Sequence, residues 1–458
     1  MKSKKRILLQ FQNLTYLYNG LAAVLTKYSI NDIEIDFCVI ELGTNPEYLE
    51  YINKNKIFRH LFVLDNEFDS KIHKIHKIKE TILGKIYFEL YLKKYSRKFI
   101  VKYFNNTKYS DVFYSWGVFS IDYLGIAYPK ANFVMYGDGS GLICNHNARL
   151  MDFYNNYSIK LLKLKNPDEI ISLAPFKLEN SCNTKNVPVK ASNAKILLNI
   201  IKQDEGVQNA TNEFADYVRN ECIGYDKKIL LLAAKLEHSR YRMSESDQID
   251  IYVDMVKKYA TKDSLVIIKR HPGTKDPVSA LQQKCACKIA TIPDKLAPLP
   301  IESFWNLLNE IDCVISFIST SKVSLKILYD IEAVDAFDVV QKYHVKGYVN
   351  PYLKAFKEIC ERLPTWDKKS IIYETDIMPD LAEFYRTTDA PHKEDVSPEV
   401  ENLRKQITDL KNSTSWKVGR AITWMPRKTK AVFRLVRQGG IKTVIKALRK
   451  KVLSEIFR

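Results

Sequence analysis

The sequence lacks several features that mark well-known classes of protein. No apolar run in its 458 residues approaches the ~20 residues of a membrane-spanning helix, and the longest runs, such as residues 229–234, have the length of a strand. Near the N-terminus, Gln10, Gln12 and Asn13 interrupt the first apolar run, so a secretory signal is not expected. Internal repeats of the solenoid type are also absent.

Metal-binding patterns are missing as well. The eight cysteines are scattered, and their one close pair, Cys285-Ala-Cys287, does not have the Cys-x-x-Cys spacing of a zinc site. We therefore expect free thiols in a reducing compartment. The sequence contains no His-x-x-x-His, Asp-x-Asp or Walker-type pattern, so we expect neither a bound metal nor another cofactor.

Positive charge is plentiful but unevenly distributed. The net charge is +18, and residues 413–458 contain thirteen Lys or Arg and one acid, which leaves +6 for the other 412 residues. In this tail, apolar residues recur at helical spacing along 441–452, and Trp416 and Trp424 precede them. A basic amphipathic helix favours attachment to an anionic membrane. Nucleic-acid binding and a disordered tail are the alternatives; the mildly basic body argues against the first and the regular apolar stripe against the second.

Apolar runs alternate with helical patterns along most of the chain. Strand-like runs lie at residues 6–11, 33–42, 58–64, 111–114, 132–136, 228–234, 265–268, 288–292, 312–317 and 333–337. Helical patterns lie at residues 14–28, 70–103, 193–222, 244–259, 300–309, 321–329 and 400–410. This alternation predicts an α/β fold with two Rossmann-like domains, each built on a mostly parallel sheet, that face one another across a cleft.

The predicted domains follow from this pattern. We expect residues 1–190 to form the first Rossmann-like domain and residues 191–386 to form the second. Residues 177–192 are polar and suggest a linker between them. Residues 387–412 are predicted to be a linker with a short helix, and residues 413–458 a helical basic tail.

Two short motifs each follow an apolar run and carry reactive side chains. Residues 132–141 read NFVMYGDGSG, and the glycines beside Asp138, including Gly139, allow the backbone to approach a ligand closely. A carboxylate there can accept a proton from an acceptor hydroxyl, although Asp and Gly are also common in plain turns. Both motifs are expected at the carboxyl ends of strands, where ligands sit in open sheets of this kind.

The second motif, residues 265–273, reads LVIIKRHPG. Lys269, Arg270 and His271 cluster directly after the apolar run, and Pro272 turns the chain. A protonated imidazole beside two cations suits a departing phosphate, because it neutralises developing charge and can donate a proton. A surface turn with solvated cations is the alternative.

Weaker candidates surround these motifs. Ser316, Ser319 and Thr320 lie between a predicted strand and helix, where hydroxyls and free N–H groups can bind an anion or simply cap the helix. Glu302 can hydrogen-bond a ribose, or it can be an acid in the first turn of a helix. Gln12 and Asn13 end the first strand and are candidates for the acceptor side.

These motifs together resemble a known family. Gly137-Asp138-Gly139, His271-Pro272 and Ser319-Thr320 occur in the order found in bacterial sialyltransferases of the polysialyltransferase and lipooligosaccharide types, and Pro300-Ile301-Glu302 is similar as well. The resemblance covers about residues 6–340. Gly137 departs from it, because the family usually has a second acid there.

The resemblance implies a glycosyltransferase-B fold and an inverting, metal-independent transfer from CMP-sialic acid. It makes Asp138 the general base, His271 the group that assists departure of CMP, and Ser319 and Thr320 the phosphate ligands. The tail resembles extensions of bacterial surface-polysaccharide glycosyltransferases that work at the inner face of the cytoplasmic membrane. We therefore expect a peripheral membrane enzyme that modifies a cell-surface glycan such as capsule or lipopolysaccharide. The alternatives are a transferase using a UDP-hexose and a non-catalytic membrane- or polysaccharide-binding protein.

Overall fold

The structure is a computed structural model in which two compact units are distinguished, Met1–Thr388 and Asp389–Arg458. All residues that it describes belong to the first unit. They are residues 4–40, 61–64, 97–115, 124–125, 127–137, 167–175, 187–234, 244–271, 277–317, 319–343, 356, 358 and 361. The tail, the predicted linker at 387–412 and the predicted helix at 400–410 lie outside them.

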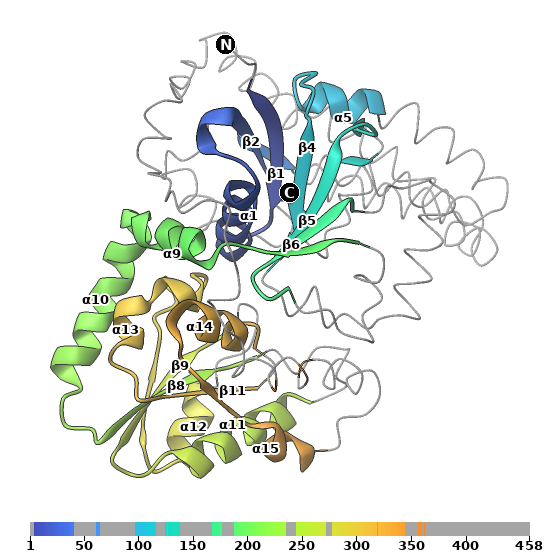
Figure 1. Ribbon diagram of the computed structural model, residues 1–458. Coiled ribbons are helices and arrows are strands. Elements are labelled where there is room, and N and C mark those ends of the chain that lie inside the picture. The colour runs from blue at the N-terminus through green and yellow to red at the C-terminus, as the bar shows by residue number, and fades with distance from the viewer. Residues whose placement is uncertain are drawn as a thin grey trace, which may run out of the picture. The chain divides into compact units, whose positions relative to one another are not determined.

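A seven-stranded parallel sheet forms from the N-terminal part of the chain, with the order β3-β2-β1-β4-β5-β6-β7 (Figure 1). Its strands are β1 (Lys5–Phe11), β2 (Ile33–Ile40), β3 (Leu61–Leu64), β4 (Asp111–Ser115), β5 (Asn132–Gly137), β6 (Glu169–Ser172) and β7 (Val189–Ala191). Every residue of β4 is buried, as expected for parallel strands covered on both faces. The strand order reverses between β1 and β4, as in a doubly wound fold.

The next part of the chain forms a five-stranded parallel sheet with the order β10-β9-β8-β11-β12. Its strands are β8 (Lys227–Leu232), β9 (Ser264–Lys269), β10 (Lys288–Thr291), β11 (Cys313–Ser316) and β12 (Ala333–Asp335). Here the order reverses between β8 and β11. The predicted α/β class with two doubly wound parallel sheets is therefore confirmed.

Some of the described helices begin at a capping side chain: Asn13, Asn193, Asp204 and Ser244 each accept a hydrogen bond from a backbone N–H of the first turn that follows. In the first sheet's region they are α1 (Leu14–Lys27), η1 (Ile30–Asp32) and α5 (Arg97–Tyr103). The later helices are α9 (Ala194–Gln203), α10 (Glu205–Glu221), α11 (Glu245–Tyr259), α12 (Val278–Lys284), η4 (Ile301–Ser303), α13 (Trp305–Leu308), α14 (Ser321–Tyr329) and α15 (Phe337–Gln341). Ser244 and Asp247 form the capping box of α11 that their spacing predicts.

Several predicted elements differ from the observed ones. The predicted helix over 193–222 is two helices, because Asp204 ends α9 and caps α10 with its side chain. The segment 177–192 was predicted to be a linker, but Val189–Ala191 pairs with β6 as the seventh strand. The predicted helix over 300–309 is a 3-10 turn followed by α13. Of the predicted helix over 70–103, the described residues show α5 alone.

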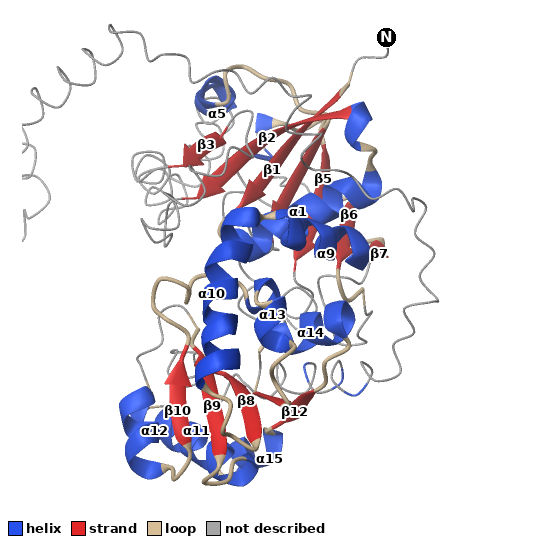
Figure 2. Cartoon of the chain, turned by 90° about the vertical axis from the view of Figure 1, so that its left-hand side faces the viewer, coloured by secondary structure: helices blue, strands red, loops and turns tan. Residues whose placement is uncertain are grey.

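Alternate residues of the second sheet pack on opposite faces. Leu230, Leu265, Ile267 and Val314 belong to the core that also contains residues of η4, α13 and α14. The intervening residues, Ile229, Leu231, Val266, Ile268 and Ile315, pack with residues of α11 and α15. Figure 2 shows α10, α13 and α14 close to one another, beside this sheet. Because side chains alternate along a strand, the face occupied by any strand residue can be read from this pattern.

Helix α1 packs very closely on the first sheet at Gly20. A Cβ atom on Gly20 would lie 2.7 Å from both Leu9 Cδ1 and Tyr136 Cζ. The hydroxyl of Tyr136 donates a hydrogen bond of 2.6 Å to the carbonyl oxygen of Gln10. A glycine is required here because its hydrogen leaves room for the tyrosine ring.

In the part of the chain that the structure describes, no helix combines the length and apolar character needed to cross a membrane. Across the same residues, no group of three or more His, Cys, Asp or Glu side chains is placed to hold a metal ion.

Candidate functional site

The carboxyl ends of three neighbouring strands align in the second sheet. Lys269 is in register with Leu232, and Leu232 is in register with Ser316. Each is the last residue of its strand, and the reversal of strand order falls between β8 and β11. In open α/β sheets ligands bind beyond this edge at this point of reversal. The alternation also places Lys269 and Ser316 on the face covered by η4 and α14, because Ile267 and Val314, two residues earlier in each strand, pack there.

Lys269 is almost completely buried, with 9% of its surface exposed. Burial lowers the pKa of its ammonium group to about 8, the charge of Glu302 opposes that change, and Arg270 lowers the pKa further. Its Nζ donates a hydrogen bond of 2.5 Å to the carbonyl oxygen of Ala297. The charge of Glu302 offsets only part of the cost of burying this ammonium. A further anion bound nearby would therefore stabilise its charged form.

Glu302 is buried within η4 and makes contacts with α14. Its carboxylate accepts a hydrogen bond from the hydroxyl of Ser324, and its backbone carbonyl accepts one from Tyr329. Burial, followed by the charge of Glu302, raises the pKa of Tyr329 above its ordinary value, so the phenol remains a hydrogen-bond donor. Two hydrogen bonds, from Ser324 and from Tyr329, thus attach Glu302 to α14.

Ser316 ends β11 with its side chain fully buried. Its Oγ has no hydrogen-bond partner among the described residues. Because a buried hydroxyl ordinarily finds a partner, this atom is suited to a ligand or an ordered water.

Ser319 and Thr320 lead into α14 and are both half-buried. Their carbonyls accept backbone hydrogen bonds from Lys322 at 3.1 Å and from Val323 at 2.9 Å. Thr320 occupies the N-cap position, but its side chain makes no capping hydrogen bond. Helix α14 begins five residues after Ser316 ends β11, so the positive end of its dipole lies at the carboxyl edge of this sheet.

Arg270 and His271 follow Lys269 at this edge. Arg270 is half-buried and forms an ion pair with Asp294. His271 follows it and is exposed. Pro272 lies outside the described residues, as do Asp138 and Gly139, although Gly137, which precedes Asp138, ends β5.

The corresponding edge of the first sheet carries a small polar cluster. The Nε2 of Gln12 donates to Ser115 Oγ at 3.4 Å, and the backbone N–H of Ser115 donates to the side-chain oxygen of Gln10 at 3.2 Å. Asn13 caps α1, where its side chain accepts a hydrogen bond of 3.1 Å from the backbone N–H of Tyr16. Gln10 was not predicted as a site residue; its signal in the sequence is a polar residue inside an apolar strand.

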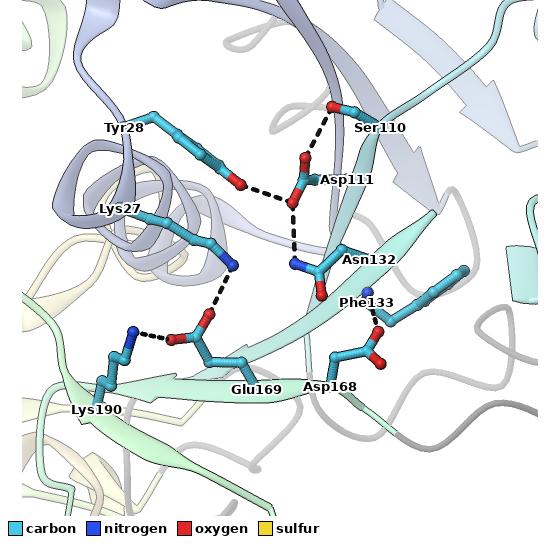
Figure 3. Close-up of polar contacts among 9 residues, drawn as sticks. All are labelled: Lys27, Tyr28, Ser110, Asp111, Asn132, Phe133, Asp168, Glu169 and Lys190. Carbon is cyan, nitrogen blue, oxygen red and sulfur yellow. Dashed lines mark hydrogen bonds and ion pairs between the residues drawn. The ribbon is translucent and has the colours of Figure 1, made fainter. Parts of the chain in front are cut away.

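A second polar cluster lies at the opposite edge of the first sheet (Figure 3). Glu169, which begins β6, pairs with Lys27 at 2.6 Å and with Lys190 at 2.7 Å. Asp111, which begins β4, accepts hydrogen bonds from Tyr28 at 2.7 Å and from Asn132 at 2.9 Å. This edge holds the amino ends of the strands, whereas ligands bind beyond the carboxyl ends. We therefore interpret the cluster as a structural network that connects the end of α1 to the sheet.

Of the candidates in the second sheet, the structure places Lys269 and Ser316 on one face of one edge. Glu302 acts on Lys269, and Ser324 joins Glu302 to α14. Ser324 was missed; its signal in the sequence is a hydroxyl beside Val323 and Leu325 in an otherwise apolar helix.

No protein-family model and no curated protein sequence matches the chain. Several solved structures show a likeness to the chain at TM-scores below 0.5. The UDP-GlcNAc 2-epimerase from Methanocaldococcus jannaschii is 11% identical with a TM-score of 0.42, and the match covers 84% of this chain and 98% of that one. The wall teichoic acid polymerase TagF is 12% identical over 89% of each chain, with a TM-score of 0.39. A family 9 glycosyl transferase from Veillonella parvula is 11% identical over 79% of this chain and 97% of that one, with a TM-score of 0.33. Likeness at this level establishes neither an activity nor a substrate for this chain.

Proposed function

We propose that the chain is an inverting, metal-independent glycosyltransferase that moves sialic acid, or a related nonulosonic acid, from a CMP donor to a cell-surface glycan. The observation that carries this proposal is the position of two buried groups at the carboxyl edge of the second sheet: Lys269, and the hydroxyl of Ser316, which has no partner among the described residues. Both lie beside the start of α14, in the position where doubly wound sheets bind nucleotides.

The chemistry of that edge suits a phosphate monoester. CMP leaves as a dianion, and its departure without a metal requires fixed positive charge and hydrogen-bond donors. Lys269 supplies charge, Ser316 Oγ supplies a donor, and the backbone N–H groups at the start of α14 supply the positive end of a helix dipole. Ser319 and Thr320 lie where they can add hydroxyl donors.

The motifs in the sequence assign the remaining roles. His271 lies at the exposed end of the Lys269-Arg270 segment, so its imidazolium can protonate or neutralise the departing phosphate oxygen. Asp138 follows β5 in the other sheet and serves as the general base for the acceptor hydroxyl, with Gly139 allowing close approach. Gln12 and Asn13 belong to the acceptor side. In this proposal the two sheets form the two domains of a glycosyltransferase-B enzyme, residues 1–190 and 191–386.

The proposed enzyme works at the cytoplasmic face of the inner membrane. Its basic tail attaches it to the anionic lipid surface, where lipid-linked glycan acceptors are available. The body of the enzyme thus binds the sugar donor and the glycan acceptor, and the tail binds the membrane.

The donor test compares product formation from CMP-sialic acid with that from UDP-hexoses, using a mixture of oligosaccharide acceptors. We expect product with the CMP donor alone. Exchange of Asp138 or His271 for Ala should reduce turnover at least 100-fold, about the smallest contribution of general acid–base catalysis. Asp250→Ala, which removes the exposed partner of Lys284, is the control and should leave turnover unchanged.

Product with UDP-hexoses alone would replace the donor assignment with the UDP-hexose alternative. If neither substitution lowered turnover, or if no donor gave product, the chain would instead be a binding protein of the membrane or of polysaccharide.

A further inference from the structure

We propose that Gln10 binds the acceptor, with its side-chain amide donating hydrogen bonds to hydroxyl oxygens of an uncharged sugar at the carboxyl edge of the first sheet. The inference rests on the proposed function and deepens it. It adds a residue that selects the acceptor, beside Gln12 and Asn13, and it names the chemical class of the acceptor's terminal sugar.

Gln10 lies where the strand order of the first sheet reverses. It is the last residue but one of β1 and is in register with Tyr114 of β4. The reversal falls between these two strands. Ligands of open α/β sheets bind beyond the carboxyl ends of the strands at such a point. The side chain of Gln10 therefore belongs to the part of this sheet where a substrate is expected.

The orientation of the Gln10 amide is set by Ser115, the last residue of β4. The backbone N–H of Ser115 donates a hydrogen bond of 3.2 Å to Gln10 Oε1. A backbone N–H can only donate, so the oxygen of the amide, and not its nitrogen, must face Ser115. Because Oε1 and Nε2 are bonded to the same carbon, Nε2 also lies at the end of β4.

The amide nitrogen of Gln10 has unused hydrogen-bonding capacity. Gln10 is completely buried, and its Nε2 has no hydrogen-bond partner among the described residues. This nitrogen carries two N–H donors, and buried polar groups nearly always have a partner. Its neighbours Leu9 and Phe11 are fully buried apolar residues, so packing alone gives no reason for an amide at this position. A ligand with acceptor oxygens would satisfy these donors.

Polar groups connect Gln10 to the surface. Ser115 is fully buried, and its Oγ accepts a hydrogen bond of 3.4 Å from Nε2 of Gln12. Gln12 is half-buried, and Asn13, which follows it, is exposed. The contact between Gln12 and Ser115 is longer than the usual limit of about 3.2 Å, so it is weak. An incoming sugar hydroxyl can therefore replace it and reach the amide of Gln10.

The chemistry of these groups favours a neutral sugar. Gln10 Nε2 offers N–H donors, and Ser115 Oγ keeps a hydrogen that it can donate. Both groups are uncharged, and so are the described residues that follow β1 and β6 at this edge, residues 12–13 and 173–175. Hydroxyl oxygens suit such donors, whereas a sialic acid at the end of the acceptor would bring a carboxylate that loses its water among uncharged groups.

The first measurement compares acceptors with the full native chain and CMP-sialic acid as donor. The neutral acceptors are lactose, N-acetyllactosamine and maltose, and the anionic acceptors are sialyllactose and disialic acid. We expect product with the neutral set, and a kcat/KM at least about tenfold lower with the anionic set. Product mainly from the anionic set would overturn the inference and leave the proposed transferase standing.

The second measurement tests Gln10 itself. Gln10→Met keeps the length of the side chain but loses both amide donors, so the KM for a neutral acceptor should rise about tenfold while the KM for CMP-sialic acid is unchanged. Among deoxy forms of that acceptor, the one that lacks the contacted hydroxyl should show a similar rise with the native chain. It should show no further rise with Gln10→Met, because one interaction can be lost only once.

Tyr128→Phe is the matched control. Tyr128 is buried and its hydroxyl has no partner among the described residues, but it precedes β5 and so lies towards the amino edge of the same sheet. This variant should keep both KM values of the native chain. If Gln10→Met did not fold, the comparison of neutral and anionic acceptors and the deoxy forms would still decide with the native chain, because each predicts a loss there.

The inference and the proposed function fail in different ways. An unchanged acceptor KM in folded Gln10→Met, or losses that add between Gln10→Met and every deoxy form, would show that Gln10 serves the fold alone. Either result would overturn the inference and leave the proposed function standing. Absence of product from every acceptor with every donor would overturn the proposed function and this inference with it.

Discussion

At the scale of single residues, substitution of Ser316 should affect the stability of the fold and the binding of CMP in different ways. Its buried hydroxyl lacks a partner among the described residues, so Ser316→Ala removes a desolvated polar group and should leave stability unchanged or raise it by about 1 kcal/mol. Loss of a hydrogen bond to a charged phosphate should weaken CMP by about tenfold or more. Chemical denaturation and calorimetry measure the two effects.

The matched control is Ser303→Ala. Ser303 Oγ is also fully buried and also has no partner among the described residues, but Ser303 lies on η4 against α10, whose Gln208 and Thr211 donate hydrogen bonds to its carbonyl oxygen. This variant should show the same change in stability with unchanged CMP affinity. Equal weakening of CMP by both variants would assign the effect of Ser316 to packing.

The sequence allowed residues at strand ends to be identified, but it did not indicate which helices contact one another. Lys269 and Ser316 were identifiable because parallel strands end at a common edge, and each follows an apolar run. The link from Glu302 through Ser324 depends on how η4 packs against α14, which no spacing in the sequence expresses. Gln10 and Gln12 meet Ser115 across more than 100 residues, and only the strand order brings them together.

At the scale of elements, the contact between α1 and the first sheet depends on Gly20. Gly20→Ala would improve helix propensity by about 1 kcal/mol, but its Cβ would lie 2.7 Å from Leu9 and Tyr136. Overpacking of a fully buried ring typically costs about 1–3 kcal/mol, and we expect this term to dominate and lower the unfolding free energy. Gly224→Ala is the control, because no atom lies within 4 Å of its added Cβ; it should be neutral or slightly stabilising in urea denaturation.

The polar network at the amino edge of the first sheet should contribute to stability at neutral pH. Burial would raise the pKa of Glu169, but hydrogen bonds from Lys190 and Lys27 outweigh burial and hold the pKa below its ordinary value. A depressed pKa stabilises the fold above the unfolded value near 4.3, and this contribution is lost as the pH falls below it.

Glu169→Gln should therefore lower the unfolding free energy at pH 7 by about 1–3 kcal/mol, with a smaller difference at pH 3.5. Denaturation at the two pH values measures this. Asp250→Asn, which breaks the exposed pair with Lys284, should change stability by less than about 0.5 kcal/mol. An equal loss from Glu169→Gln at both pH values would show that the charge of Glu169 is not what stabilises this edge.

Most long elements were predictable, and the short ones were not. Buried parallel strands such as β4 and β9 are apolar on both faces, so continuous apolar runs reveal them. Strand β6 begins with an acid and β7 contains an exposed lysine, so neither shows a continuous apolar run. Both strands form because neighbouring strands supply their backbone hydrogen bonds. Asp204 divides one long helical pattern because its side chain caps the second helix.

At the scale of the whole molecule, charge separates the body from the tail. Residues 413–458 carry +12 of the net +18. A nucleotide site needs only a few fixed cations, so this surplus has no evident use in transfer chemistry. A membrane surface, in contrast, attracts each additional basic residue by about 1 kcal/mol.

Deletion of residues 413–458 should therefore release the protein from vesicles that contain anionic lipid and leave transfer to a soluble acceptor unchanged. Sedimentation with anionic and with neutral vesicles measures the first effect, and product formation measures the second. A variant in which residues 441–452 are scrambled keeps the charge but loses the apolar stripe, so it should bind anionic vesicles more weakly than the native chain and more tightly than the deletion. Vesicle binding that survives the deletion would place the membrane contact in the body of the enzyme instead.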